Sequence, residues 1–227
     1  MEHLALACVK AVRSLFTPGM ALIVVKSLII TIIALTFFFF AASGFFFWLF
    51  GAESPLSWLG AFGTGVIAWF LFPGIMPIIV NFFDTRIVGL IEQNDYPASP
   101  RAKEPPFFAE LWHDVRFSAK AVFLNLLLLP LYLIPIVNLL VFYLLNGYLL
   151  GREFFVMVGR QHMPIEEAEA LRKKNDYLVT MAGTALAINA TIPIINLFAP
   201  IWGIALMTHL YHRLSGTPKM EVLPPQL

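Results

Sequence analysis

Residues 27–52 have the sequence SLIITIIALTFFFFAASGFFFWLFGA and contain no charged side chain. A helix needs about 20 apolar residues to cross the hydrocarbon core of a bilayer, and this stretch is longer than that. Residues 51–55 (GAESP) then predict a turn, and residues 54–83 are again uncharged. We therefore predict two long transmembrane helices, and we expect a kink where Pro73 and Pro77 interrupt the second one.

The composition of the whole chain is that of a membrane protein. Hydrophobic residues make up 59% and charged residues 13% of the 227 positions, whereas soluble domains carry about 25% charged residues. The net charge of +1 gives no basic excess for binding the phosphates of a nucleic acid. The single cysteine, Cys8, excludes an intramolecular disulfide. Residues 1–7 are too short to be a lipoprotein signal peptide, so we expect Cys8 to be a small apolar helix residue.

The chain before the first span predicts a short amphipathic helix over residues 3–16. Apolar residues such as Cys8 and Leu15 recur at helical spacing, and Ser14 falls on the opposite side. A helix of this kind is typical of segments that lie in the membrane interface. Pro18-Gly19 predicts its end.

Two polar segments separate the remaining apolar parts of the chain. Residues 84–120 are mixed in character, and prolines between residues 97 and 106 break the chain before a new amphipathic helix begins near Phe107. Residues 152–176 are charged again, and Pro164 is placed to open a helix there.

The distribution of basic residues predicts which side of the membrane each segment faces. Lys and Arg are absent from the turn at 51–57 and from the uncharged runs at 121–151 and 177–208. Because Lys and Arg accumulate on the cytoplasmic side, we predict that all basic segments and both termini are cytoplasmic. The basic residues are Lys10, Arg13 and Lys26; Arg86, Arg101, Lys103, Arg116 and Lys120; Arg152, Arg160, Arg172, Lys173 and Lys174; and Arg213 and Lys219.

The lengths of the last two uncharged runs predict how deeply they enter the bilayer. Runs 121–151 and 177–208 must each leave the cytoplasm and return, which takes about 40 residues for two full crossings with a turn. Both runs are shorter than that, so we predict two hemi-penetrating helical hairpins; two pairs of short, strongly tilted spans are the alternative. The expected fold is an all-α integral membrane protein with one domain over residues 1–214 and a disordered Pro-rich tail at 215–227.

An internal repeat connects the two predicted hairpins. Residues 134–139 (IPIVNL) recur as residues 192–197 (IPIINL), each about midway through its uncharged run. The proline would break the incoming half-helix, and Asn138 or Asn196 could cap the outgoing one. Broken helices repeated at membrane depth are a pointer to a transport site. The alternative is that each Pro-Asn pair forms only a tight turn.

Other patterns are less specific. Gly147 and Gly151 form a G-x-x-x-G pattern that permits close approach of two helices. His209 and His212 would share a helix face, but no carboxylate lies near them in the sequence, so we expect neither a metal site nor a cofactor. Arg152 lies at the cytoplasmic edge, either as a snorkelling side chain with an ion-pair partner or as part of a gate. The sequence contains no Walker loop, dinucleotide fingerprint or nucleophile elbow, and we expect no enzymatic activity.

Several segments together are typical of one family of membrane proteins. They are Pro18-Gly19, residues 150–155 (LGREFF), residues 167–172 (EAEALR), residues 192–200 (IPIINLFAP), His209 and Arg213. In these features the chain resembles the CysZ-type sulfate permeases and the related etoposide-induced membrane protein family, over about residues 5–213. The resemblance implies two long spanning helices, two hemi-penetrating hairpins, dimer-based assembly, and sulfate uptake that feeds cysteine synthesis.

One departure from that family concerns the anion. The permeases carry a sulfate-binding loop with the pattern Pro-Gly-x-Arg-Arg, whereas residues 18–22 here are Pro-Gly-Met-Ala-Leu. Backbone N–H groups at a helix N-terminus could still bind an anion, but bidentate recognition by arginine is lost. Lys26, about one turn further on, is a point charge rather than a fork.

These observations predict an inner-membrane permease for sulfate or a similar small anion. Its expected partners are the lipid bilayer, the anion and further copies of the chain in a homo-oligomer, and not nucleic acid. A membrane scaffold or accessory protein without a transport cycle is the alternative, and the missing arginine pair favours it. The residues that we expect to contact substrate are Gly19, Met20, Lys26, Asn138, Asn196 and Arg152.

Overall fold

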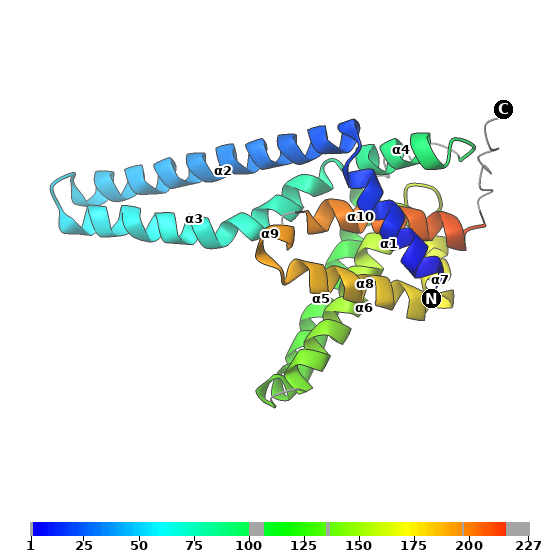
Figure 1. The fold of residues 1–227 in the computed structure, drawn as a ribbon. Helices are drawn as coiled ribbons and strands as arrows, with labels where there is room; N and C mark the ends of the chain where they lie inside the picture. Colours follow the sequence, from blue (N-terminus) through cyan, green and yellow to red (C-terminus); the bar gives the residue numbers. More distant parts are fainter. Residues whose placement is uncertain (1, 100–106, 135–136, 197, 217–227) are drawn as a thin grey trace. The chain divides into compact units, whose positions relative to one another are not determined.

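The computed structural model describes residues 2–99, 107–134, 137–196 and 198–216, which form helices and no β-strand (Figure 1). This confirms the predicted all-α class. The helices are α1 (Glu2–Leu15), α2 (Pro18–Phe50), α3 (Pro55–Asn81), α4 (Asp84–Asp95), α5 (Phe107–Leu128), the 3-10 helix η1 (Leu129–Leu133), α6 (Val137–Gly159), α7 (Ile165–Lys174), α8 (Asp176–Ala190), α9 (Pro193–Asn196) and α10 (Ala199–Leu214).

The chain divides into two compact units. Residues 21–83 form one, called here the hairpin unit, and residues 1–20 with 84–227 form the other, called the main unit. The expected single domain over residues 1–214 stays a prediction. Most of the expected disordered tail, residues 217–227, lies outside the described residues.

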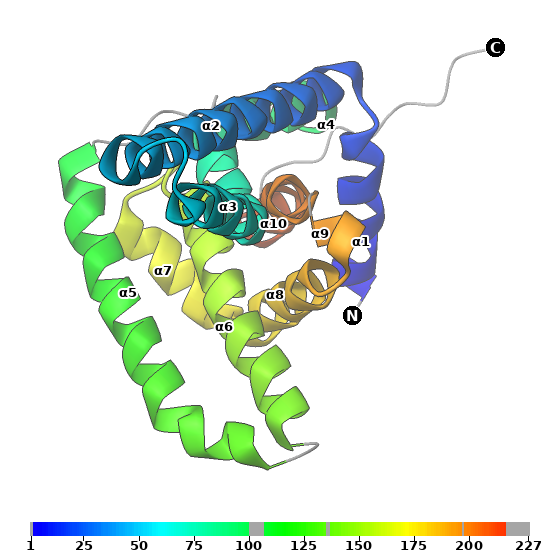
Figure 2. The ribbon, with the colours of Figure 1, turned by 90° about the vertical axis from the view of Figure 1, so that its left-hand side faces the viewer.

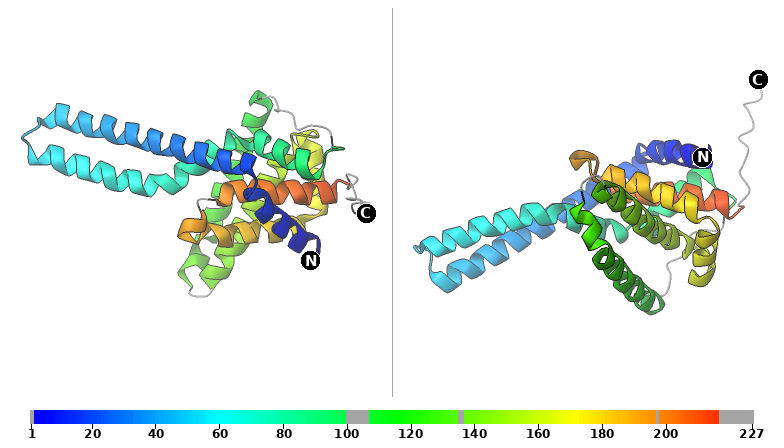
Figure 3. Two further views of the ribbon diagram at one scale, coloured as in Figure 1. Left: turned by 45° about the horizontal axis from the view of Figure 1, so that its top comes forward. Right: turned by 90° about the horizontal axis from the view of Figure 1, so that it is seen from below.

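The hairpin unit consists of α2 and α3, which run side by side in opposite directions (Figures 1 and 3). Gly51, with φ of 78°, adopts the left-handed backbone that ends α2. Ser54 caps α3 by accepting a hydrogen bond of 3.3 Å from the Leu56 N–H. The ring of Phe47 meets that of Trp58 edge-on at 5.2 Å between centroids. The predicted turn is therefore confirmed, and α3 bends in its C-terminal part, where the prolines lie (Figure 1).

The outer surface of the hairpin unit suits a lipid environment. Both helices are long and apolar enough to cross a membrane, and at about 1.5 Å per residue the 33-residue α2 extends roughly 50 Å. Large apolar side chains remain exposed along both helices. Among them are Phe37, Phe40, Trp48, Phe62, Trp69 and Phe70.

Helix α10 is the centre of the main unit. Every residue from Ile201 to His212 is buried, and α10 packs against α1, α4, α6 and α8 (Figure 2). A helix that is buried all round needs an apolar surface on every side, which explains the high content of Ile, Leu, Met and Trp in its middle.

Helices α6 and α8 make the closest helix pair in the main unit. A Cβ atom added to Gly183 would lie 1.9 Å from the Gly147 carbonyl oxygen and 2.6 Å from the Gly151 Cα. The backbones therefore touch directly, which only glycine at these positions permits. The G-x-x-x-G pattern is thus used between two helices of the same chain.

Helix α1 packs against α10 through small residues. Ala7, Ala11 and Ser14 are buried, whereas Val9 and Phe16 are 68% and 83% exposed. The expectation that Ser14 faces away from the packed side is wrong. Small side chains let α1 approach α10 closely, and the Ser14 hydroxyl gains a partner there in His209, at 3.1 Å.

The two predicted hairpins differ in length. Residues 115–133 and helix α6 are each long and apolar enough to cross a membrane, because helix continues past the uncharged run on both sides. Helices α8 and α10 have 15 and 16 residues, about 22–24 Å at 1.5 Å per residue, against a hydrocarbon core of about 30 Å. The hemi-penetrating depth stays a prediction, and helix length alone favours it only for the second hairpin.

Candidate functional site

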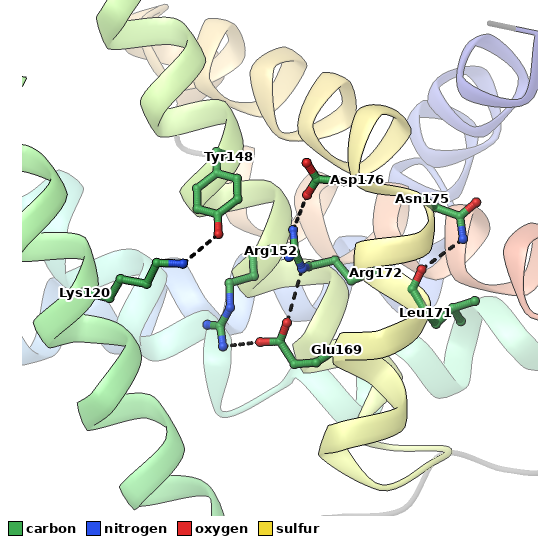
Figure 4. Close-up of polar contacts among 8 residues, drawn as sticks. All are labelled: Lys120, Tyr148, Arg152, Glu169, Leu171, Arg172, Asn175 and Asp176. Carbon is green, nitrogen blue, oxygen red and sulfur yellow. Dashed lines mark hydrogen bonds and ion pairs between the residues drawn. The ribbon is translucent and has the colours of Figure 1, made fainter.

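A cavity of about 380 Å³ lies between α5, α6 and α7 and is lined mainly by charged side chains. Five of them are basic and one is acidic, which gives a formal lining charge of +4 (5 − 1). We call this the basic pocket, and most of its polar residues are drawn in Figure 4. It is lined by Arg116, Phe117 and Lys120 of α5, Tyr148 and Arg152 of α6, and Glu169, Arg172 and Lys173 of α7.

Glu169 holds two arginines in the basic pocket. Its carboxylate forms an ion pair with Arg152 and accepts a hydrogen bond of 3.2 Å from the Arg172 Nε (Figure 4). The side chains of Arg152 and Arg172 are 11% and 5% exposed. Arg172 also pairs with Asp176, one turn further along. Both guanidinium groups are therefore fixed in position, which lowers the entropy lost when they bind another group.

Aromatic rings shape the other walls of the pocket. The Arg152 guanidinium lies over the Phe117 ring, 3.7 Å from its centroid, a distance typical of a cation–π contact. Lys120 donates a hydrogen bond of 3.0 Å to the Tyr148 hydroxyl. The Arg172 guanidinium lies 5.5 Å from the centroid of the same Tyr148 ring. Lys120 of α5 and Arg152 of α6 thus each contact an aromatic residue of the other helix.

The connection between α6 and α7 places these groups. The chain turns at residues 160–163, where the Met163 N–H bonds to the Gly159 carbonyl oxygen at 3.0 Å. Pro164 is the N-cap of α7, which confirms the predicted start of that helix. A Cβ on Gly159 would lie 2.8 Å from that of Ala168, so α7 packs closely on the end of α6. Its next turn then presents Glu169 to Arg152.

Of the predicted substrate residues in the main unit, only Arg152 lines the basic pocket. Gly19 lies at the start of α2, where an added Cβ would be 3.1 Å from the Leu90 side chain. Met20 is 0% exposed, so its side chain has no surface for a substrate. Lys26 belongs to the hairpin unit and is exposed. No observation tests these residues as binding residues, and they stay predictions.

The two repeated segments share one backbone hydrogen bond. The N–H of Asn138 donates to the Ile134 carbonyl oxygen at 2.9 Å, and that of Asn196 donates to Ile192 at 2.7 Å. The predicted capping by asparagine is wrong, because Asn138 lies inside α6 and the N-cap of α10 is Phe198. Capping by Asn138 or Asn196 would start the outgoing helix at residue 139 or 197, whereas α6 begins at Val137 and α10 at Ala199.

Most residues of the basic pocket were not predicted as site residues from the sequence. Within each helix the lining residues recur three or four positions apart, as Arg116 and Lys120 do, which places them on one face. That spacing is visible in the sequence. The sequence does not show that three such faces meet, because this depends on how α5, α6 and α7 pack.

Comparison with known families assigns the chain. The family profile described as "Sulfate transporter CysZ/Etoposide-induced protein 2.4" matches residues 7–200. The chain belongs to this family. The match runs from α1 to the start of α10 and therefore includes both units and the basic pocket. No curated protein and no solved structure matches the chain significantly.

Family membership, together with four helical segments among the described residues that are suited to crossing a bilayer, identifies a multi-pass membrane protein of a transporter family. The resemblance on which the sequence interpretation rested is thereby confirmed.

Proposed function

We propose that this protein is an inner-membrane permease that passes sulfate or a similar small anion into the cytoplasm, with the basic pocket as an anion-binding station. The observation that carries this proposal is the formal charge of +4 around a cavity of about 380 Å³. Such a concentration of positive charge raises the local concentration of anions. Fixed guanidinium groups also offer the paired N–H donors that an oxyanion accepts best.

The pocket compensates for the missing arginine pair near the start of α2. Ala21 and Leu22 stand where the related permeases carry arginine, and Arg152 and Arg172 would provide that function in this chain. Glu169 neutralises part of their charge, which would keep binding weak enough for release. Asn138 and Asn196, at the two Ile-Pro turns, are the further positions where we propose substrate contact.

The proposed orientation places the basic pocket on the cytoplasmic side. Its residues come from two of the basic segments, around residues 116–120 and 152–173, and the positive-inside rule assigns both to the cytoplasm. Single cysteines at positions 98 and 166, in a Cys8→Ser background, would then react only from the cytoplasmic side and one at position 54 only from outside. Reaction at 166 from outside would reverse the orientation.

Uptake of labelled sulfate into proteoliposomes tests the transport proposal, with other anions as competitors. A charge-assisted hydrogen bond contributes about 1.5–3 kcal/mol, so Arg152→Gln is expected to lower uptake at least tenfold. Lys173→Gln and Lys174→Gln are a matched pair of neighbours, because Lys173 lines the pocket and Lys174 does not. The first should reduce uptake more than the second.

Two outcomes would overturn this proposal. One is equal uptake by wild type and Arg152→Gln, with both proteins folded. The other is a folded wild type that moves no tested anion. In the latter event the scaffold or accessory role becomes the better hypothesis, and the pairing of Arg152 and Arg172 with Glu169 would be purely structural. Homo-oligomeric assembly is proposed for either role.

A further inference from the structure

Three side chains distant in sequence converge in the main unit, away from the basic pocket. Glu92 comes from α4, His162 from the turn after α6, and His212 from the last turns of α10. The Nε2 atoms of His212 and His162 lie 2.7 Å and 2.9 Å from the same Glu92 oxygen, Oε1. One ligand atom from each residue lies within 4.8 Å of those from the other two.

The cluster is almost fully removed from solvent. The side chains of Glu92 and His162 are 6% exposed and that of His212 is 0% exposed. Burial alone would raise the pKa of the Glu92 carboxyl, but the hydrogen bonds and charges of His162 and His212 outweigh it and hold that pKa below its ordinary value. The group is thus a buried carboxylate. Its second oxygen, Oε2, is buried with no hydrogen-bond partner among the described residues, an arrangement that is costly in a core.

We propose that Glu92, His162 and His212 form a binding site for a divalent transition metal ion of the zinc type. Two imidazole nitrogens and one carboxylate oxygen are a known zinc donor set, and three protein ligands leave one position open for water or another ligand. Tetrahedral ligands at about 2.0–2.1 Å from zinc are separated by roughly 3.3 Å. The present distances of 2.7 Å and 2.9 Å therefore require each imidazole to withdraw by about half an ångström.

Aromatic side chains orient the two imidazoles. The ring of Tyr96 stacks on His212 at 4.1 Å between centroids, and that of Tyr211 stacks on His162 at 5.0 Å. The stacked rings hold their Nε2 atoms 2.7 Å (His212) and 2.9 Å (His162) from the Glu92 Oε1. Fixed ligand rings are a recurrent feature of metal sites, because they reduce the reorganisation that binding requires.

His209, one turn from His212 on α10, shows the contrasting arrangement. Its Nε2 lies 3.1 Å from the Ser14 hydroxyl, and its Nδ1 lies 3.0 Å from the Tyr96 hydroxyl. Both ring nitrogens are therefore occupied by neutral partners, as in an ordinary core histidine. His209 is not a ligand in this proposal and provides a matched control.

The cluster adjoins an open volume. Glu92, Gln93 and Tyr96 are among the residues that line a cavity of about 610 Å³ beside α4. The carboxylate therefore connects the buried imidazoles with an open volume, as a metal site requires. A bound ion would link α4, the end of α6 and α10, and would raise the stability of the main unit by mass action. This role is independent of the proposed transport function.

The test uses the full chain, purified in detergent without a histidine tag and stripped with a chelator. We expect one zinc ion per chain by mass spectrometry after dialysis against micromolar Zn²⁺. Replacement by Co²⁺ should give the intense visible bands of a tetrahedral complex, and Zn²⁺ should raise the unfolding temperature. Absence of any cobalt band and of any thermal shift in the folded wild type would overturn the proposal, whatever the variants do.

Substitutions then locate the ion. Glu92→Gln and His162→Asn are expected to weaken zinc binding at least tenfold and to abolish the cobalt bands, whereas His209→Gln keeps both. His162 lies in a turn, so its substitution is the least disruptive to helix packing. Retention of the ion by both ligand variants, or equal loss in His209→Gln, would place the ion elsewhere and contradict the assignment.

Discussion

The contact between α6 and α8 makes a sharp prediction about stability. In Gly183→Ala the new methyl group would lie 1.9 Å from the Gly147 carbonyl oxygen, 2.4 Å from the Gly151 N and 2.6 Å from the Gly151 Cα. All three atoms belong to backbone, so no side chain can rotate away. An ordinary carbon–oxygen contact is about 3.5 Å, so α6 and α8 would have to separate by roughly 1.5 Å.

That separation would loosen the most extensive helix contact of the main unit. Overpacking in a well-packed core costs typically about 1–3 kcal/mol, and a clash with backbone belongs at the upper end or above. Alanine favours the helix over glycine by about 1 kcal/mol, which offsets part of this cost. We therefore expect Gly183→Ala to lower the free energy of unfolding by about 2 kcal/mol or more.

Thermal unfolding in detergent, followed by fluorescence or by loss of the monodisperse peak, measures the change. Gly89→Ala on α4 is the control, because a Cβ there meets nothing within 4 Å and should stabilise by about 0.5–1 kcal/mol. A Gly183→Ala protein as stable as wild type would refute the argument that α6 and α8 depend on a glycine contact.

Three further predictions concern acid stability, hairpin depth and the Ile-Pro turns. Burial lowers the pKa of His209 from 6.5 to about 3. Between these two pH values the unfolded chain binds a proton at His209 and the folded chain does not, so the free energy of unfolding should fall by about 1.4 kcal/mol for each pH unit below 6.5. The fall should be less steep in His209→Gln. Leu133→Cys and Ile195→Cys, each in a cysteine-free background, should both resist a membrane-impermeant reagent from outside if the hairpins are hemi-penetrating; rapid reaction at either would show a complete crossing. Asn138→Leu and Asn196→Leu should abolish anion flux without loss of folded protein if the turns contact substrate, and unchanged flux would leave the asparagines as turn residues only.

The sequence was most informative where a single physical requirement governed the structure. The uncharged stretch at 27–52 and the turn after it predicted α2, Gly51 and the start of α3 correctly, because a helix that crosses the bilayer needs about 20 predominantly apolar residues in succession. The same reasoning did not identify the buried side of α1. There the packing depends on the small size of Ala7 and Ala11, and hydrophobicity does not distinguish a lipid-facing valine from a packed alanine.

Contacts between distant segments could not be predicted from local patterns. Gly147 and Gly151 indicated a close helix contact, but Gly183 as their partner follows only from the fold. Likewise, no carboxylate lies near His212 in the sequence, whereas the fold brings Glu92 to it from 120 positions away. Single glycines, histidines and carboxylates are common in proteins. Their structural roles here depend on which of them the fold brings into contact.

The length of the helices in the first hairpin has the same physical origin as the basic pocket. Counting uncharged residues treats the first charge as the end of a membrane helix, yet α5 continues through Lys120 and α6 through Arg152 without interruption. Charged side chains are tolerated in those helices because each has a partner there, Lys120 the Tyr148 hydroxyl and Arg152 the Glu169 carboxylate. The residues that lengthen the helices beyond the apolar runs are therefore the residues that gather into a positive cavity. The proposed anion site lies at the ends of membrane helices, where cations can be both paired within the protein and reached from water.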